Sequence, residues 1–287
     1  MIEMTWNNRD FETCSVKTSH AEISVMDNHG SGTPVVLLHG NSLGKEVFRS
    51  QFGAFEDSRR IVALDLPGHG SSSDAENPRQ TYCLEGYADC VAETLGKLDI
   101  GQSVVVGWSL GGHIGYELLE RQPDLKGLMT ISSPPIEQRA DGSMAGFQLF
   151  PRLVLLSLAE LSDVEIDELA ALIGDYDTNE TMLQEPDWHR LIARTDGLAR
   201  QYLFEALAAQ PPRRQRELAE NSSIPLAIIN GGDDRFVDTD YVADLSYRNI
   251  WSGKPIIMNG LGHAPHINGP DEFNAILRSF VNDVAPQ

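Results

Sequence analysis

The stretch that decides the fold of this chain reads Val104-Val105-Val106-Gly107-Trp108-Ser109-Leu110-Gly111-Gly112-His113. Its β-branched residues predict a buried strand, G-x-S-x-G predicts a tight turn, and a helix is expected to begin at Leu110. A serine at such a turn is held in a strained backbone conformation that costs about 1–3 kcal/mol. Gly107 and Gly111 flank the turn because a side chain at either position would crowd it. The pattern therefore predicts Ser109 as an accessible nucleophile at the end of a strand.

The composition limits both the size of the fold and its partners. The chain has 287 residues, enough for one large α/β domain with an insertion or for two ordinary domains. Lys and Arg total 22 against 42 Asp and Glu, so the formal net charge is −20. A field of this sign repels nucleic acid and anionic membranes, and no apolar run approaches the ~18 residues of a membrane span. We expect a small-molecule substrate, no nucleic-acid partner and no membrane insertion, and the oligomeric state stays open.

Two features of the sequence indicate the cellular compartment of the protein, namely its cysteines and its first six residues. Cys14, Cys83 and Cys90 are an odd number of thiols without the spacing of metal ligands, so we expect them to be reduced. Residues 1–6 show neither the basic region nor the apolar region of a signal peptide. The prediction is a cytoplasmic protein that holds no metal.

Short apolar runs alternate with helical patterns along most of the chain, which predicts a mainly parallel sheet covered by helices on both faces. The expected strands are 21–26, 35–39, 61–64, 104–107, 128–131, 226–230 and 255–258, with 11–16 as a candidate hairpin partner at the N-terminus. Helices are expected at 85–98, 110–120, 239–246 and 271–281.

Between residues 134 and 223 the periodicity is helical throughout. Ser162-Asp163-Val164-Glu165 fits a capping box that opens one helix, and a longer helix is predicted over 187–209. We interpret this region as a helical cap inserted after the sixth strand, over the carboxyl edge of the sheet, where open α/β sheets place their sites. The predicted organisation is a core of 1–135, a cap of 136–222 and a second part of the core, 223–287.

A serine hydroxyl needs a base to remove its proton and an acid to orient that base. His263 follows the last expected strand in a glycine-rich loop that is free to turn toward the serine, and His266 is its rival three residues on. The acid is expected after the strand 226–230, where Asp234 and Asp233 are both candidates. The chain order Ser, acid, His favours His263 as base, and we take Asp234 as the acid.

An oxyanion hole needs two hydrogen-bond donors that point at one position. One candidate is the backbone N–H of Leu110, because the residue after the nucleophile opens the helix. The other is Asn41, in His39-Gly40-Asn41-Ser42, through its backbone N–H and its side-chain amide. The alternative is that Asn41 only stabilises a turn.

Four residues are predicted to contact the substrate. Gly40 and Trp108 are neighbours in sequence of the expected oxyanion donor and of the nucleophile. Phe147 and Phe150 belong to an apolar stretch that either lines the substrate pocket or packs the cap onto the sheet.

The motifs Asp65–Gly70, Gly107–Gly112 and Gly262-His263 resemble those of the α/β-hydrolase superfamily, and the resemblance covers nearly the whole chain. More narrowly, the chain resembles the metal-independent N-acyl-homoserine lactonases of the AidH type. The passages that carry this second resemblance are His39–Ser42, Leu84–Asp89, Gly107–Gly115, Ala193–Gly197 and Asn249–Gly253.

The resemblance implies an α/β-hydrolase fold, a triad of Ser109, His263 and Asp234, and opening of a lactone ring through an acyl-enzyme. It implies no metal and no organic cofactor, and degradation of a quorum signal as the outcome. The lactonase pattern has glutamate where this chain has Asp234, so the carboxylate must approach the imidazole by about one methylene. The resemblance is weaker between 137 and 185, so an acyl-chain preference does not carry over.

The sequence is compatible with other functions as well. Within enzymes, the alternatives are a carboxylesterase or a C–C bond hydrolase with the same triad. Ser109 stands where epoxide hydrolases and haloalkane dehalogenases need an aspartate, so those activities are disfavoured. A non-catalytic small-molecule receptor of the same fold is the alternative from a different class. A complete set of triad residues favours the enzyme.

Overall fold

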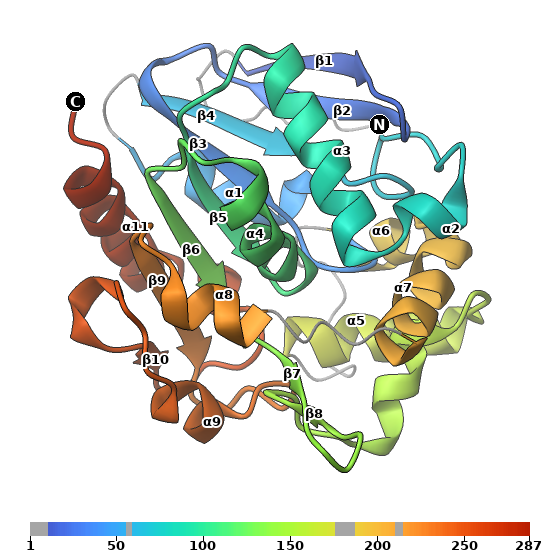
Figure 1. The fold of residues 1–287 in the computed structure, drawn as a ribbon. Helices are drawn as coiled ribbons and strands as arrows, with labels where there is room; N and C mark the ends of the chain where they lie inside the picture. Colours follow the sequence, from blue (N-terminus) through green and yellow to red (C-terminus); the bar gives the residue numbers. More distant parts are fainter. Residues whose placement is uncertain (1–10, 56–58, 176–186, 210–214) are drawn as a thin grey trace.

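A computed structural model describes residues 11–55, 59–175, 187–209 and 215–287. Residues 1–6, on which the expectation about a signal peptide rests, lie outside the described residues. Within the described part, eight strands form one sheet in the order β1-β2-β4-β3-β5-β6-β9-β10 (Figure 1). These strands are β1 (Glu12–Lys17), β2 (Glu22–Asp27), β3 (Ser31–Leu38), β4 (Arg59–Leu64), β5 (Val104–Trp108), β6 (Gly127–Ile131), β9 (Leu226–Gly231) and β10 (Ile256–Met258).

Helices connect the strands and cover the sheet. The α-helices are α1 (Arg49–Phe52), α2 (Pro78–Thr81), α3 (Leu84–Lys97), α4 (Leu110–Arg121), α5 (Asp163–Gly174), α6 (Trp188–Arg194), α7 (Gly197–Ala209), α8 (Gln215–Asn221), α9 (Thr239–Asp244), α10 (Pro265–Asn268) and α11 (Pro270–Val284). Three 3₁₀ turns are η1 (Lys45–Phe48), η2 (Pro151–Ser157) and η3 (Trp251–Gly253).

Strand direction follows the predicted pattern. β2 pairs antiparallel with β1 and β4, and the strands from β4 to β10 in the sheet order are all parallel. Every expected strand is present, with bounds that differ by up to four residues. The segment 11–16 supplies β1, the antiparallel edge strand. The fold is therefore the expected α/β-hydrolase arrangement, a mainly parallel sheet flanked by helices.

Both faces of the sheet are buried, as its continuous apolar strands predict. Along β3, Val35 and Leu37 belong to one hydrophobic cluster, whereas Val36 and Leu38 belong to the other, because successive side chains point to opposite faces. The first cluster includes apolar residues of α1 and α11, and the second includes those of α3 and α4. The sheet is thus the middle of three layers, and its carboxyl edge is left to the connecting loops.

The insertion between β6 and β9 is mostly helical, and one expectation about it is wrong. It contains α5 to α8, but also a hairpin in which β7 (Glu137–Gln138) pairs antiparallel with β8 (Met144–Ala145) (Figure 1). The turn contains Asp141, whose carboxylate accepts from Ser143 N, and Gly142 at φ 85°. Asp-Gly at a turn is a hairpin signal, but strands of two residues carry no periodicity.

The prediction of one continuous helix over 187–209 is also wrong. The segment is broken into α6 and α7 by Thr195, whose ψ is 129°. Asp196 then accepts from the N–H of Leu198 at 3.0 Å and starts α7. A Cβ on Gly197 would lie 1.9 Å from the Ala159 oxygen, so the start of α7 is pressed against another backbone segment. The capping box at Ser162 is confirmed, and it opens α5.

The residues between α6 and α7 also connect the insertion to the sheet domain. The Tyr82 hydroxyl donates to Asp196 Oδ2 at 2.6 Å, and Asp196 N donates to the Gly68 oxygen at 2.8 Å. The residues between α6 and α7 are therefore an anchor, because two hydrogen bonds join them to loops that follow β4.

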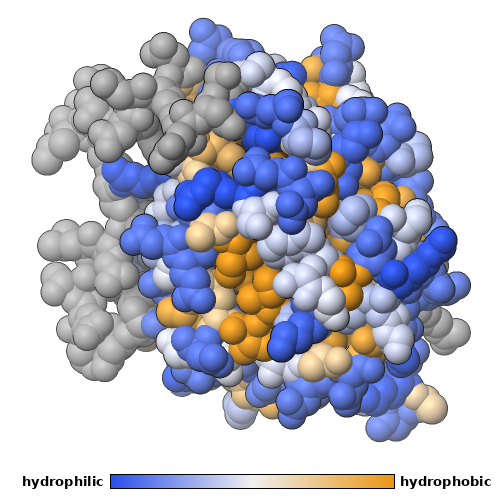
Figure 2. All heavy atoms as spheres, turned by 90° about the vertical axis from the view of Figure 1, so that its left-hand side faces the viewer, coloured by the Kyte–Doolittle hydropathy of each residue, from blue (hydrophilic) through white to orange (hydrophobic). Residues whose placement is uncertain are grey.

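The surface is mixed in character. On the face shown in Figure 2, apolar residues gather among hydrophilic ones, which is normal for folded proteins. Among the described residues, no helix combines the length and the apolar character that a membrane crossing requires.

Glycines at the sheet–helix junction give a stability prediction. Gly111→Ala should destabilise the fold by about 3 kcal/mol, the upper end of the usual cost of overpacking, because its Cβ would lie 2.0 Å from the Leu38 oxygen and backbone cannot move away cheaply. The matched control is Gly96→Ala in α3, where no atom lies within 4 Å of the added Cβ. That variant should stabilise the protein by about 0.5–1 kcal/mol. Urea unfolding followed by circular dichroism measures both, and equal midpoints would contradict the prediction.

Candidate active site

Ser109 stands at the turn between β5 and α4, with φ 51° and ψ −114°. Its N–H donates to the Ile131 oxygen at 2.9 Å, which ties the turn to β6. A Cβ on Gly107 would lie 2.2 Å from the Gly111 oxygen, and one on Gly111 would lie 2.0 Å from the Leu38 oxygen. The two glycines therefore let three backbone segments meet at the turn, as the sequence predicts, and the serine takes the strained conformation.

His263 follows β10, and Asp234 follows β9. His263 Nδ1 lies 2.9 Å from Asp234 Oδ2 and 3.2 Å from Oδ1. Both side chains are buried, whereas Asp233 is exposed. A Cβ on Gly231 would lie 2.0 Å from the Gly262 oxygen, so glycine at this position lets the two loops touch. The shorter carboxylate thus reaches the imidazole at ordinary hydrogen-bond distance.

The surroundings of Asp234 keep it ionised. Burial raises the pKa of Asp234, but the charge and hydrogen bond of His263 and the Phe236 N–H, 2.8 Å from Oδ1, outweigh burial and lower the pKa overall. An ionised carboxylate can only accept, so the proton of this contact sits on His263 Nδ1. The other ring nitrogen, Nε2, is then available to take a proton.

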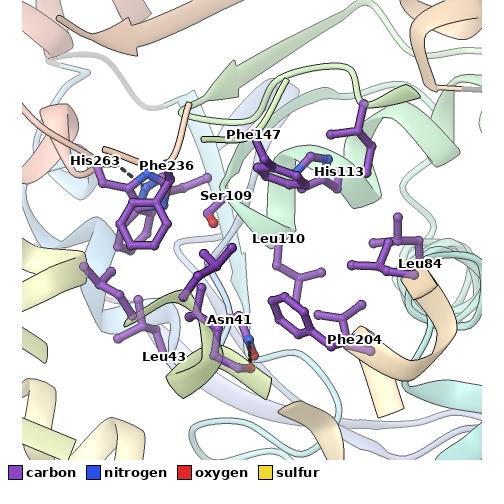
Figure 3. Close-up of a pocket in the computed structure, with 18 residues that line it drawn as sticks. Asn41, Leu43, Leu84, Ser109, Leu110, His113, Phe147, Phe204, Phe236 and His263 are labelled. Carbon is purple, nitrogen blue, oxygen red and sulfur yellow. Dashed lines mark hydrogen bonds between the residues drawn. The ribbon is translucent and has the colours of Figure 1, made fainter. Parts of the chain in front are cut away.

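Aromatic side chains fix the orientation of His263. Trp108 is fully buried, and its Nε1–H donates to the His263 oxygen at 2.8 Å. The Phe236 ring lies 4.3 Å from the imidazole, centroid to centroid, and the Trp108 ring lies 5.8 Å away. Figure 3 shows Phe236 beside His263, with Ser109 on the same cavity.

The cavity over Ser109 is lined by apolar residues and a few polar ones. The lining residues are Gly40, Asn41, Leu43, Leu84, Trp108, Ser109, Leu110, His113, Ile136, Phe147, Leu153, Leu156, Ile173, Leu203, Phe204, Leu207, Phe236 and His263. No Asp, Glu, Lys or Arg side chain is among the described residues that line it. Such a cavity suits an uncharged ligand, because a charge would lose its hydration there without a partner.

The two candidate oxyanion donors lie on this cavity. Leu110 is the first residue of α4, so its N–H has no acceptor within the helix. Asn41 Nδ2 donates to the Leu156 oxygen at 3.3 Å, so the Asn41 backbone N–H is the better candidate donor. A Cβ on Gly40 would lie 3.4 Å from Ser109 Cβ, and its absence keeps this loop close to the nucleophile.

The sequence model of the alpha/beta hydrolase family matches residues 35–276. The chain belongs to this family. Among solved structures, the chain is similar to the N-acyl homoserine lactonase AidH complexed with N-butanoyl homoserine, at 36% identity and a TM-score of 0.87, over 95% of this chain and 97% of that one. A mutant of AidH complexed with N-hexanoyl homoserine lactone aligns with the same identity and TM-score.

Among curated proteins, this alpha/beta hydrolase is similar to the pimeloyl-[acyl-carrier protein] methyl ester esterase of Neisseria meningitidis serogroup A. The two chains are 26% identical over 256 residues, which cover 87% of this chain and 77% of the relative. It is also similar to the AB hydrolase superfamily protein YisY of Bacillus subtilis, at 22% identity over 93% of this chain and 98% of the relative.

Phe150 lies outside the set that lines the cavity of this hydrolase, although the sequence predicts substrate contact. Its ring packs 5.3 Å from Phe236, which does line the cavity, so Phe150 sits one layer behind. Phe147 lines the cavity, and its contact with a substrate stays a prediction. Phe236 is two residues after Asp234 in sequence, and His113 is four residues after Ser109, but the sequence pattern singles out neither.

His266, the rival base, is buried behind the site. Its ring lies 4.7 Å from that of Trp108 and 5.2 Å from that of Phe48. Neither ring nitrogen has a hydrogen-bond partner among the described residues. Burial lowers the pKa of His266 to about 3, and the nearby His263 adds to this effect. His266 is therefore a neutral packing residue.

This burial makes the fold sensitive to acid. Between pH 6.5, the ordinary histidine pKa, and about 3, the unfolded chain binds a proton at His266 that the folded protein does not, so stability falls as the pH falls. His266→Phe should flatten this part of the curve by up to about 1.4 kcal/mol per pH unit. Urea unfolding at several pH values measures the slope, and a slope equal to that of the parent would show that His266 is not the source.

Proposed function

We propose that this alpha/beta hydrolase is a serine hydrolase that opens the lactone ring of N-acyl-homoserine lactones, a quorum-quenching activity. The observation that carries the proposal is the similarity to AidH at 36% identity over nearly the whole of both chains. The site supports it, because a Ser, His and Asp set adjoins a cavity lined by uncharged side chains. A neutral acyl lactone matches such a cavity.

In the proposed reaction, Ser109 attacks the lactone carbonyl while His263 Nε2 takes its proton. Asp234 holds the imidazole in the tautomer that makes this transfer possible. The oxyanion that forms on the carbonyl oxygen is stabilised by the N–H groups of Leu110 and Asn41. The ring oxygen then leaves as an alcohol and receives its proton from His263.

Water completes the cycle. The acyl-enzyme keeps both ends of the former ring, so deacylation by water activated at His263 releases an N-acyl-homoserine and restores Ser109. The proposal assigns residues 136–222 as a cap, because more than a third of the lining residues come from this segment, among them Phe147, Leu153 and Leu207. Residues 1–135 and 223–287 form the core that carries the triad.

Hydrolysis of an open-chain carboxylic ester is the second candidate. It is favoured by the similarity to pimeloyl-[acyl-carrier protein] methyl ester esterases at 26% identity. The same triad would serve both reactions, because each begins with attack on an ester carbonyl. The two differ in the leaving group, which stays attached in a lactone and departs as a separate alcohol in a methyl ester.

The proposed activity predicts acid release from lactones. Purified protein in a pH-stat should release acid from N-hexanoyl- and N-decanoyl-homoserine lactone, with and without EDTA, and Ser109→Ala should abolish the release while leaving the fold intact. Ester hydrolysis without lactone hydrolysis would move the function to the second candidate. Activity of the Ser109→Ala variant near that of the parent would remove the serine mechanism.

The assignment of the acid has its own test. Asp234→Asn should lower kcat about 10⁴-fold, because the amide favours the wrong imidazole tautomer. Asp233→Asn is the matched control, since this neighbouring carboxylate is exposed, and its kcat should stay within about twofold of the parent. Steady-state kinetics with one lactone decide the matter, and the reverse pattern would transfer the role to Asp233.

A further inference from the structure

A second histidine lies on the cavity, one helical turn from the nucleophile. His113 lies on α4, four residues after Ser109. Its backbone N–H donates to the backbone oxygen of Ser109 at 3.1 Å. Figure 3 shows Ser109 between His263 on one side and His113 with Phe147 on the other. His113 takes no part in the proposed proton transfers. Its imidazole is one of the few polar side chains on this cavity, so a role in ligand recognition is worth testing.

Gln215 fixes the tautomer of His113. His113 Nδ1 lies 2.9 Å from Gln215 Oε1, while Gln215 Nε2 donates to the His113 oxygen at 3.2 Å and to Glu117 Oε1 at 3.5 Å. If the Gln215 side-chain amide were rotated by 180°, its oxygen would face two other acceptors, the His113 oxygen and Glu117 Oε1. The orientation with Oε1 toward His113 Nδ1 is therefore required. The amide oxygen can only accept, and the ring proton therefore sits on Nδ1. The other nitrogen, Nε2, carries a lone pair.

His113 is also neutral. Burial lowers its pKa to about 4; the hydrogen bond to Gln215 opposes this shift and His263 adds to it. Among the described residues, no group forms a hydrogen bond with Nε2, and the tilted Phe147 ring lies 5.5 Å from the imidazole, centroid to centroid. An acceptor in an apolar wall is costly when it lacks a donor. A ligand that brings an N–H or O–H group to this wall would satisfy it.

We propose that His113 is a specificity-determining residue whose Nε2 accepts a hydrogen bond from an N–H group two bonds away from the scissile carbonyl of the substrate. In the proposed function, on which this inference rests, that group is the amide N–H of the acyl-homoserine lactone. Simple lactones and esters without this N–H would leave the acceptor unpaired, so His113 discriminates acylamino lactones from unsubstituted ones.

Bond geometry supports the assignment. The backbone hydrogen bond from His113 N to the Ser109 oxygen places the two residues one helical turn apart, about 5.4 Å along the axis of α4. A nitrogen two bonds from the carbonyl carbon lies about 2.5 Å from it, and a hydrogen bond adds about 3 Å. A carbonyl held at Ser109 therefore places the amide N–H within reach of His113 without any movement of α4.

The test measures binding on the Ser109→Ala protein, where the ligand stays intact. The two ligands are N-hexanoyl-homoserine lactone and its isostere α-hexanoyloxy-γ-butyrolactone, in which an ester oxygen replaces the N–H. Isothermal titration calorimetry should give an affinity about 10- to 100-fold higher for the amide. Adding His113→Leu should bring this ratio close to one, and His113→Gln, which keeps an acceptor oxygen, should restore part of it. Because the ratio compares two ligands on one protein, the folded fraction of a variant cancels.

A ratio that survives His113→Leu, or equal affinities in the Ser109→Ala protein, would overturn the inference, and so would failure of the amide lactone to bind. In the background with Ser109 intact, His113→Leu should raise KM for the amide lactone with little change in kcat. The proposed function fails if the protein with Ser109 intact does not hydrolyse the lactone. The two failures can be told apart, because the binding ratio is measured on the Ser109→Ala protein and does not depend on turnover.

Discussion

The close approach of three backbone segments at the serine turn is the constraint on which the rest of the site depends. Gly107 and Gly111 let β5, α4 and β3 meet where any Cβ would lie about 2 Å from a carbonyl oxygen. The contact holds Ser109 at φ 51° on the carboxyl edge of the sheet. Because β9 and β10 run parallel to β5, their loops end at this same edge. His263 therefore lies on the same cavity as Ser109, with Asp234 hydrogen-bonded to its imidazole.

The sheet could be predicted from sequence because its signals are local. A buried parallel strand is a short apolar run, and a serine turn is a run of five residues, so neither depends on distant contacts. The order of Ser109, Asp234 and His263 along the chain added the pairing that the structure shows as a hydrogen bond. The break of the helix at Thr195 is different, because the apolar pattern continues across it and the start of α7 is packed against the distant Ala159 backbone. Contacts of that kind leave no periodic trace.

The walls of the cavity were harder to predict for the same reason. Phe150 and Phe236 are both apolar, and only their mutual packing decides which of them faces the ligand. The tautomer of His113 is set by Gln215, which lies 102 positions further along the chain. Sequence can place a residue on an element, but the state of a buried polar group is fixed by the partner that the fold brings to it.

Charge outside the cavity and neutrality inside it act together in the proposed reaction. The chain carries a formal net charge of −20, yet the described residues that line the cavity include no Asp, Glu, Lys or Arg. A neutral lactone enters such a cavity without an electrostatic penalty, whereas hydrolysis leaves a carboxylate there. That anion loses hydration without gaining a cation, and the field of the acidic protein repels it. In the proposed reaction, the same apolar walls would therefore bind the lactone more tightly than the opened product, and the acidity of the chain would favour product release.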